Sequence, residues 1–106
     1  MSVCTILYIQ AVVRFEWNQA KNESNKKKHG VDFETAQLVF DDPFCVSVER
    51  VEAGEERWQA IGMIEKVVLI VVVHTYRSEG SDEIVRIISS RRATSHERKL
   101  YAKANR

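Results

Sequence analysis

Cysteine, proline and glycine are all scarce in this chain of 106 residues, which contains two, one and four of them respectively. Two cysteines, Cys4 and Cys45, cannot make a disulfide framework or a metal-ligand pattern, so we expect both to be buried thiols, with a disulfide between them as the alternative. The chain also has no linker-like tract, low-complexity segment or internal repeat. We therefore expect one small domain.

Long apolar runs are also missing. The longest, Val3 to Val13, is interrupted by Thr5 and Gln10 and is too short to cross a bilayer. It lacks the basic start and the small-residue cleavage site of a secretory signal peptide. These absences favour a cytoplasmic protein without a membrane partner.

The sequence has no metal-binding pattern. His29, His74 and His96 do not have the spacing of zinc ligands. No group of acidic residues resembles one that holds two Mg²⁺ ions. We therefore expect no metal and no cofactor, so that any catalysis must come from side chains alone.

Charge is unevenly distributed, although the net charge is only +1. Residues 1–30 contain five Lys or Arg against two Asp or Glu, residues 31–83 contain four against twelve, and residues 84–106 contain seven against one. If the two basic ends fold together, they make a surface that attracts RNA or another phosphate-rich ligand.

Two helices are expected in the first half of the chain. Asn18 is a good N-cap for a helix over residues 19–29, and Gly30 ends it. This helix is polar almost all round, so it must lie on the surface. Asp32 caps a second helix, which Pro43 stops. The apolar stripe of the second helix has helical spacing and consists of Phe33, Ala36, Val39 and Phe40.

Strands account for most of the remaining chain. Apolar alternation, or a continuous apolar run, predicts them at residues 3–13, 14–17, 44–51, 56–62, 67–74 and around Arg86. The links between the later strands are short, which favours antiparallel neighbours, with a turn at residues 78–82. The prediction is an α+β fold with two N-terminal helices, a four-stranded antiparallel sheet and a C-terminal helix.

The most informative segment runs from the last strand into the last helix. Arg86 lies inside an apolar alternation, and Arg91 and Arg92 follow at the junction. Thr94 and Glu97 have the spacing of a capping box, so the last helix should begin directly after Thr94. Guanidinium groups fixed at such a junction match the geometry of phosphate oxygens, which predicts a phosphate-binding site.

The order of motifs along the chain resembles the BrnT family of type II toxins. The resemblance covers roughly residues 14 to 103. It is carried by Phe15-Glu16-Trp17, Ala20-Lys21, Ser24-Asn25, Lys28-His29-Gly30-Val31, Phe33-Glu34, Ala36, Val39-Phe40-Asp41-Asp42-Pro43, Glu55-Glu56-Arg57, Ile61-Gly62, Arg86-Ile87-Ile88-Ser89, Arg91-Arg92-Ala93-Thr94, Glu97-Arg98 and Tyr101.

The resemblance implies a RelE-like fold, ribonuclease activity against messenger RNA, and inhibition by a cognate BrnA antitoxin. It also implies a toxin–antitoxin complex that binds operator DNA through the antitoxin alone. The stoichiometry stays open between a homodimer and a heterotetramer with the antitoxin.

Two segments depart from the family pattern. Residues 1–13 precede the usual start, so they are either an N-terminal extension that forms a strand or the product of an upstream start codon. Residues 14–106 are expected to form a single BrnT-like toxin domain. Residues 74–83 look longer or altered where the family makes a tight hairpin, which affects the expected geometry around His74 and Tyr76.

Metal-free RNA cleavage uses the ribose 2′-hydroxyl as nucleophile. The protein must remove its proton, stabilise charge on the phosphate and protonate the leaving 5′-oxygen. We assign phosphate stabilisation to Lys28, Arg86 and Arg91. His29 is the leading acid or base, because free histidine titrates near neutrality, and Tyr101 or a lysine is its substitute.

RNA binding is assigned to three further side chains. Lys27 and Arg92 would contact the backbone, and Trp17 would stack on a base.

Each assignment has a structural alternative. His29 can simply satisfy the end of its helix, and an ion pair with Glu56 or Glu97 can hold Arg86. Arg91 can tie down the last helix. The side chains that can instead pack in the interior are Trp17, Trp58, His74 and Tyr101.

Three functional classes follow from these residues. The first is an endoribonuclease toxin, the second a non-catalytic toxin-fold subunit that binds antitoxin and tunes operator binding, and the third an RNA-binding protein without cleavage. The antitoxin could be met by the acidic residues Glu52, Glu55 and Glu56, or by strand addition along residues 3–13.

Overall fold

The computed structural model describes residues 2–3, 12–52 and 54–105. Its elements follow one another as β1 (Ser2–Val3), β2 (Val12–Glu16), α1 (Gln19–His29), α2 (Phe33–Ala36), the 3₁₀ helix η2 (Gln37–Asp41), β3 (Val46–Glu52), β4 (Glu55–Ile64), β5 (Val68–Glu79), β6 (Asp82–Arg92) and α3 (Ser95–Ala104). None of the described helices is long and apolar enough to cross a membrane.

The strands of the described residues form one mixed sheet in the order β1-β3-β4-β5-β6-β2. The α+β class is confirmed, but the prediction of four antiparallel strands is wrong in detail. Two N-terminal segments add a strand at each edge, and β2 runs parallel to β6. A parallel pair needs a long connection, and here the helices and three other strands supply it. Residues 4–11 of the strand expected at 3–13 lie outside the described residues.

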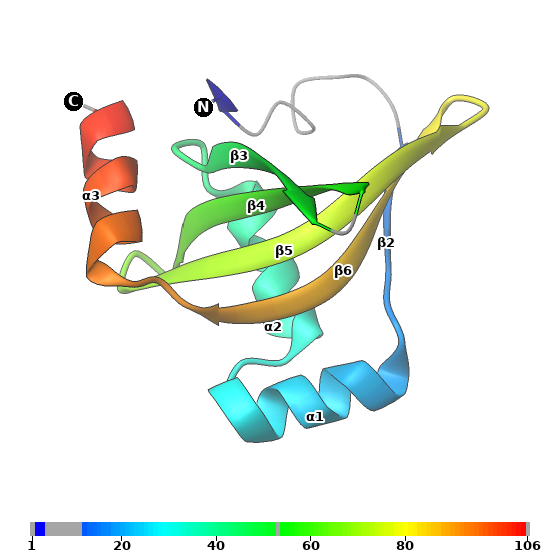
Figure 1. The fold of residues 1–106 in the computed structure, drawn as a ribbon, viewed down its shortest axis with the longest axis horizontal. Coiled ribbons are helices and arrows are strands. Elements are labelled where there is room, and N and C mark those ends of the chain that lie inside the picture. The colour runs from blue at the N-terminus through cyan, green and yellow to red at the C-terminus, as the bar shows by residue number, and fades with distance from the viewer. Residues whose placement is uncertain (1, 4–11, 53, 106) are drawn as a thin grey trace.

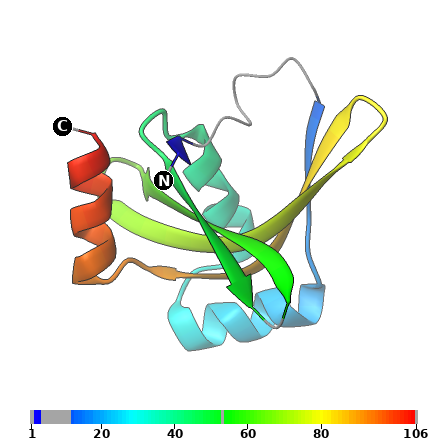
Figure 2. The same cartoon turned by 45° about the horizontal axis from the view of Figure 1, so that its top comes forward.

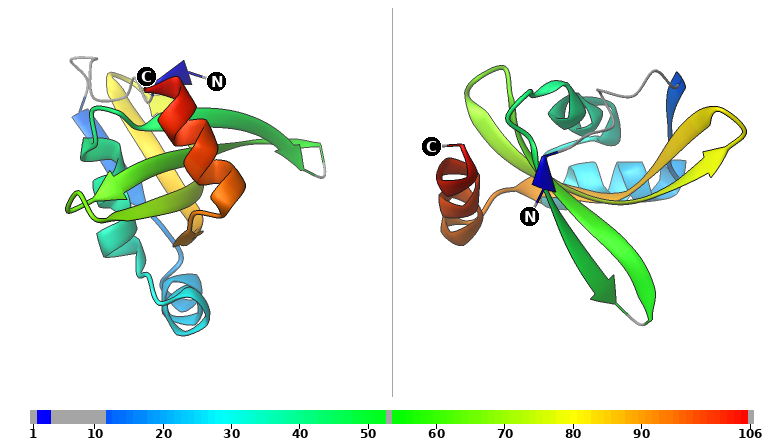
Figure 3. Two further views of the ribbon diagram at one scale, coloured as in Figure 1. Left: turned by 90° about the vertical axis from the view of Figure 1, so that its left-hand side faces the viewer. Right: turned by 90° about the horizontal axis from the view of Figure 1, so that it is seen from above.

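The helices lie on different sides of the sheet. The segment α1–α2–η2 lies on one side, and α3 stands against the other side at one end (Figures 1, 2 and 3). The tip of the β5–β6 hairpin projects at the end far from α3 (Figure 1). Among the described residues, no helix other than α3 covers this second face of the sheet.

The first helix has the predicted boundaries. The Asn18 side chain accepts a hydrogen bond from the backbone N–H of Lys21. Gly30 ends the helix with a φ of 76°, in the left-handed region that glycine adopts most easily. The polar sequence places α1 on the surface, as expected, yet it buries the side chains of Asn22 and Asn25.

The second predicted helix is split in two. Asp32 caps α2 as expected, and its side chain accepts from the Thr35 N–H at 2.7 Å. After Ala36 the chain continues as the 3₁₀ helix η2, a common ending for an α-helix. The whole predicted apolar stripe is buried, so the periodicity identified the correct face.

The β5–β6 hairpin is longer than the sequence indicated. Strand β5 does not stop at His74 but continues to Glu79, with a register shift between Val73 and His74. The turn consists of Gly80 and Ser81, and Gly80 has a φ of 62°. Residues 74–83 therefore form the outer part of a hairpin, and the polar residues after His74 continue the strand alternation.

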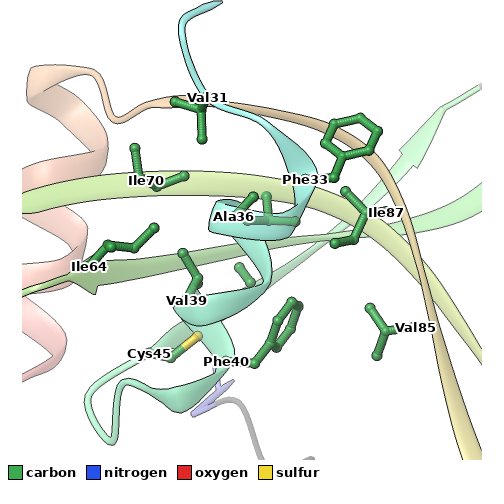
Figure 4. Packing of buried hydrophobic residues seen from close by; sticks show 12 residues of the cluster. Val31, Phe33, Ala36, Val39, Phe40, Cys45, Ile64, Ile70, Val85 and Ile87 are labelled. Carbon is green, nitrogen blue, oxygen red and sulfur yellow. The ribbon is translucent and has the colours of Figure 1, made fainter. Parts of the chain in front are cut away.

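Most of the core lies between the sheet and the α2–η2 segment (Figure 4). Phe40 is at its centre, 5.5 Å from the ring of Phe15 and 5.0 Å from that of His74. Gly62 lies directly under η2, where an added Cβ would be 2.7 Å from Val39 Cγ1. The lack of a side chain at residue 62 thus sets how closely η2 approaches the sheet.

Cys45 also lies in this core and is fully buried, as predicted. It is disulfide-bonded, however, so the expectation of a thiol is wrong at this position. Cys4 lies outside the described residues.

Candidate nucleic-acid interface

The two faces of the sheet are covered to different extents. The α2–η2 segment covers one face over the main core. On the other face, a smaller cluster built on Ile61, Val71 and Ala93 packs against Leu100 and Tyr101 of α3. We call the part of this second face that α3 does not cover the open face.

A row of polar side chains crosses the open face. Arg50 on β3 pairs with Arg57 on β4, and Thr75 on β5 pairs with Arg86 on β6. Arg86 in turn pairs with Glu16 on β2. Paired residues on neighbouring strands point to the same side of a sheet. Between β4 and β5 the printed register ends at the pair Trp58–His74, and Arg57 and Thr75 are the next residues outward from it, so they also lie on this face.

Arg86 shares a carboxylate with a second arginine. Its Nη1 lies 3.4 Å from Glu16 Oε1, and Arg77 Nη1 lies 2.8 Å from the same oxygen. The hydrogen bond from Arg77 is the main cause that lowers the pKa of Glu16, which therefore stays ionised at neutral pH. The expected structural partners of Arg86, Glu56 and Glu97, are replaced by Glu16.

Arg91 is held much more firmly than Arg86. Its Nη1 and Nη2 donate to Glu97 Oε1 and Oε2 at 2.6 and 2.8 Å, a bidentate pair. These hydrogen bonds from Arg91 are the main cause that lowers the pKa of Glu97 to about 2. Glu97 also completes the predicted capping box with Thr94. Arg91 thus ties α3 to the sheet, as its structural alternative predicted.

Tyr101 is also engaged inside the protein. Its hydroxyl donates to Asp42 Oδ2 at 2.7 Å. Burial, followed by this hydrogen bond, raises the pKa of Tyr101 above its ordinary value. The same carboxylate oxygen accepts from the Met63 backbone N–H at 2.8 Å. A tyrosine in this state is a poor proton acceptor at neutral pH.

The basic residues of α1 lie beside β6 rather than on the open face. Lys27 and Lys28 are exposed, and His29 is partly buried in the last turn of the helix. Helix α1 reaches β6 through Asn25, whose side-chain amide donates to the Ser90 carbonyl at 2.9 Å and accepts from the Ser90 N–H at 3.2 Å. The amide therefore pairs with the strand edge as another strand would.

The buried hydrogen-bonding roles of Asn22 and Asn25 were not predicted from the sequence. Asn22 accepts from the Phe33 N–H at 2.7 Å and donates to Glu34 at 2.6 Å, while Asn25 also donates to the Val31 carbonyl at 2.8 Å. The available signal was their three-residue spacing, which puts both amides on one side of an otherwise polar helix.

Of the remaining residues assigned to RNA binding, Trp17 packs against the core and Arg92 is exposed. Trp17 packs edge-on against Phe33, with ring centroids 6.1 Å apart, and its Nε1 donates to Gln19 at 3.3 Å. Arg92 is exposed. It pairs with Ile70 of the main core, so it points to the face opposite Arg91.

His74 is buried, as its structural alternative predicted, with 2% of its surface exposed. Within the described residues neither ring nitrogen has a hydrogen-bond partner. Burial lowers the pKa of His74 to about 4, so the ring is neutral at physiological pH. His74 belongs to the core and not to the open face.

The predicted site residues are thus only partly brought together. Arg86 and Arg91 share a face of the sheet, Arg92 points to the other face, and Trp17 joins the core. The described residues contain no group of three or more His, Cys, Asp or Glu placed to hold a metal ion. Chemistry at the open face would rest on arginines and on groups that approach β6 from α1.

Comparison with known proteins identifies the family. Residues 17–97 match the sequence pattern of the family described as "Ribonuclease toxin, BrnT, of type II toxin-antitoxin system". The chain belongs to the BrnT family. No curated protein is similar enough in sequence to count as a match.

A solved structure supports the BrnT fold. The 1.1 Å crystal structure of the Brucella abortus ribonuclease toxin BrnT superposes with a TM-score of 0.56. The alignment covers 79% of this chain and 99% of that chain, at 24% sequence identity. At this identity the likeness establishes the shared fold. Membership of a type II toxin family implies an antitoxin partner.

Proposed function

We propose that this BrnT-family chain is a metal-independent endoribonuclease that cleaves messenger RNA in the cytoplasm. The family is one of ribonuclease toxins. The observation that supports the proposal most directly is Arg86, an exposed guanidinium on a face that no described helix covers above it. A cation fixed on a strand stabilises a phosphorane without reorganisation during the reaction.

Arg86 keeps most of its hydrogen-bonding capacity for a ligand. Its ion pair with Glu16 is long, at 3.4 Å, and 46% of its side chain is exposed. Glu16 gives its shorter contact to Arg77. Exposed pairs of this kind contribute about 0–1 kcal/mol, so an RNA phosphate can displace the carboxylate.

The structure supports the other catalytic assignments to different degrees. Lys28 and His29 lie on the helix that borders β6, so they would supply a cation and the acid or base from beside the strand. Arg91 would orient rather than contact the phosphate while Glu97 holds it. Tyr101, with its raised pKa, stays protonated at neutral pH and is therefore a poor general base.

RNA binding would involve the remaining three assignments. Lys27 extends the charge of Lys28, and Arg92 adds a cation at the end of β6, on the face opposite Arg91. Trp17 would stack on a base only with the part of its ring that Phe33 leaves exposed.

The proposed toxin function also implies a protein partner. A BrnA-like antitoxin would neutralise the activity and carry the complex to operator DNA, on a RelE-like toxin scaffold. Measuring the mass of the purified complex distinguishes a toxin homodimer from a heterotetramer with the antitoxin.

Purified protein should cut single-stranded RNA in the presence of EDTA. Arg86→Ala should lower the rate by about 10² to 10³-fold, because one donor to the transition-state anion is lost. Lys103→Ala, on α3, is the matched control and should keep the wild-type rate. Circular dichroism checks that both variants are folded, and intact RNA after incubation with folded wild-type protein would contradict the proposal.

A second candidate is a toxin-fold subunit that binds antitoxin without cleaving RNA. The bidentate Arg91–Glu97 pair favours it, because this arginine already has a carboxylate partner. Folded protein that leaves RNA intact but forms a stable complex with its antitoxin would support this alternative. An RNA-binding protein without chemistry would instead bind RNA tightly, with affinity that falls steeply as salt rises.

A further inference from the structure

The turn that links β4 to β5, at residues 65–67, is bordered by three grooves. The largest, of about 500 Å³, lies between this turn, the segment that leads from η2 into β3, and α3. The other two have volumes of about 310 and 340 Å³ and share Val67, Val68 and Arg92. Figure 1 shows the turn beside the start of α3, far from the tip of the β5–β6 hairpin. We call the surface around these grooves the turn end.

Large apolar side chains are exposed at the turn end. Leu38, Phe44 and Val67 are 42%, 57% and 78% exposed. Leu38 and Phe44 line the largest groove together with Met63, and Met63 also lines a groove with Val67. Single exposed apolar residues are ordinary, but a connected set of them marks an interaction surface. The turn end presents such a connected set.

Two arginines border the same apolar surface. The charged residues that line the 310 Å³ groove in the described chain are Arg92 of β6 and Arg98 of α3, and the other lining residues are apolar. Both arginines are exposed, and neither has a carboxylate partner among the described residues. An apolar groove with a few charged groups at fixed places is the usual form of a binding site. This groove therefore suits a ligand that carries both apolar groups and a carboxylate.

The backbone of the turn is unusual for its residues. The Val67 N–H donates to the Ile64 carbonyl at 3.1 Å, and the two residues between them, Glu65 and Lys66, have φ values of 55° and 60°. Two central residues in the left-handed region make a type I′ turn, in which Asn-Gly is preferred. Strain of this kind is concentrated at binding sites. The turn thus presents two exposed charged side chains in place of the residues that suit its backbone best.

We propose that the turn end is the docking surface for the antitoxin, which would bind through a segment of apolar side chains flanked by carboxylates. The apolar side chains would enter the grooves beside Phe44 and Val67. A carboxylate would pair with Arg98, whose guanidinium has no such partner in the described chain. The inference rests on the proposed toxin function, which implies the antitoxin, and it adds the surface and the chemistry of the contact.

Two other occupants fit the turn end less well. An RNA strand would meet Asp41 and Glu65, whose carboxylates border the largest groove and repel phosphates. A second copy of the chain would place the same patch on both sides of a symmetric interface. That arrangement brings the unpaired arginines of both copies together. An apolar partner that carries carboxylates avoids both conflicts.

The turn end is remote from the proposed catalytic arginine. Arg92 and Arg86 are six residues apart on β6, or about 20 Å at the rise of a strand. Docking can therefore be weakened without changing the cleavage of RNA. Arg92 is also proposed above to bind RNA, so an antitoxin that occupies its groove would remove one RNA contact directly.

Binding of the purified BrnA-like antitoxin to the full chain tests the apolar part of the surface. Val67→Ser should raise the Kd about 10-fold, because a side chain that becomes buried in the complex loses its apolar surface. The matched control is Val51→Ser on β3, since Val51 is 70% exposed and lines none of the three grooves. Isothermal titration calorimetry measures both values, and circular dichroism checks the fold. Equal Kd values for the two variants would overturn the docking surface.

The charged part of the surface has its own pair of variants. Arg98→Gln should raise the Kd about 10-fold and make antitoxin binding less sensitive to salt. Lys103→Gln, which removes one charge from the same helix outside the grooves, should bind like the wild type. An Arg98→Gln variant with the wild-type Kd and salt dependence would overturn the proposed carboxylate contact.

Two further measurements separate the antitoxin from the other occupants and from the ribonuclease function. Val67→Ser should cleave RNA at the wild-type rate, bind a 2′-O-methylated RNA strand normally and keep the wild-type mass in solution. A loss of RNA affinity, or of a dimer, in Val67→Ser would overturn the proposal in favour of RNA or of a second copy. Wild-type protein that cuts RNA but binds no antitoxin would refute the docking surface alone. Wild-type protein that leaves RNA intact, while Val67→Ser loses antitoxin affinity, would refute the ribonuclease function alone.

Discussion

The side-chain amide of Asn25 takes the place of a neighbouring strand. Beyond Arg86, strand β6 has no β2 partner, and the N–H and C=O of Ser90 face α1. Buried backbone groups without partners cost free energy comparable to a lost hydrogen bond. Asn25 satisfies both groups and thereby fixes α1, with its basic last turn, against β6.

Asn25→Ala should therefore destabilise the domain by about 2–4 kcal/mol, because several buried groups lose their partners. Urea unfolding measures the change, and faster amide exchange at Ser90 would localise it. Ser24→Ala, an exposed change on the same helix, should stay within about 0.5 kcal/mol. Equal effects of the two variants would show that Asn25 has no special role.

His74 makes the domain sensitive to acid. Its folded pKa of about 4 lies below the reference value of 6.5. Above pH 6.5 both folded and unfolded forms are neutral, and the residue contributes nothing. Between pH 6.5 and 4 only the unfolded chain takes up the proton, so stability falls by about 3 kcal/mol in total.

The control for this prediction is His74→Leu, which cannot titrate. The difference in unfolding free energy between wild type and His74→Leu, followed from pH 7 to pH 4, should change by about that amount. A difference that stays constant with pH would contradict the depressed pKa.

At the scale of elements, the carboxylate of Glu97 both caps helix α3 and holds it against the sheet. Glu97 accepts from the Thr94 N–H at 2.8 Å and from Arg91 through both oxygens. Thr94→Ala should cost about 1 kcal/mol, the usual value for a lost N-cap. Glu97→Gln should cost more, about 2 kcal/mol, because it also weakens the charged pair with Arg91.

The pH dependence of Glu97→Gln gives a second readout. The folded pKa of about 2 is below the unfolded value of 4.5, so the stabilisation is complete above pH 4.5. It decreases as the pH falls toward 2. The gap between wild type and Glu97→Gln in thermal melts should therefore narrow over this range, while exposed Ser95→Ala should follow the wild type throughout.

The sequence predicted elements best where a local signal set their ends. The boundaries of α1 and the start of α3 followed from Asn18, Gly30 and the Thr94–Glu97 capping box, which act over three or four residues. The parallel pairing of β2 with β6 could not be predicted in this way, because the paired residues are about 70 positions apart in the sequence and leave no local pattern.

The same distinction applies to the candidate site. Arg86 was selected because a charge inside an apolar strand needs an explanation, and Arg91 because it lies at the junction with the capped helix. The carboxylate partner of Arg86 was not predicted, because Glu16 meets Arg86 only through the parallel pairing of β2 with β6.

At the scale of the whole molecule, the separation of the two layers depends on Gly62. A Cβ there would be 2.7 Å from Val39 Cγ1 and 2.9 Å from the Val39 carbonyl oxygen. Gly62→Ala should destabilise the protein by about 1–3 kcal/mol, because η2 must move away from the sheet. Differential scanning calorimetry measures the loss.

A double substitution tests this reason for the loss. Val39→Ala removes the side-chain contact but leaves the backbone oxygen in place, so Gly62→Ala should be only partly rescued in the Val39→Ala background. Full rescue would show that the side chain alone limits the approach, and an undiminished cost would assign the whole effect to the backbone.

The parallel pairing of β2 with β6 also has a consequence for biosynthesis. In the described fold the only strand beside Val12–Glu16 is Asp82–Arg92, which is translated after most of the chain. A nascent polypeptide that stops before Asp82 lacks both Arg86 and the whole strand that pairs with Val12–Glu16. Termination products that lack this strand therefore cannot assemble the surface around Arg86.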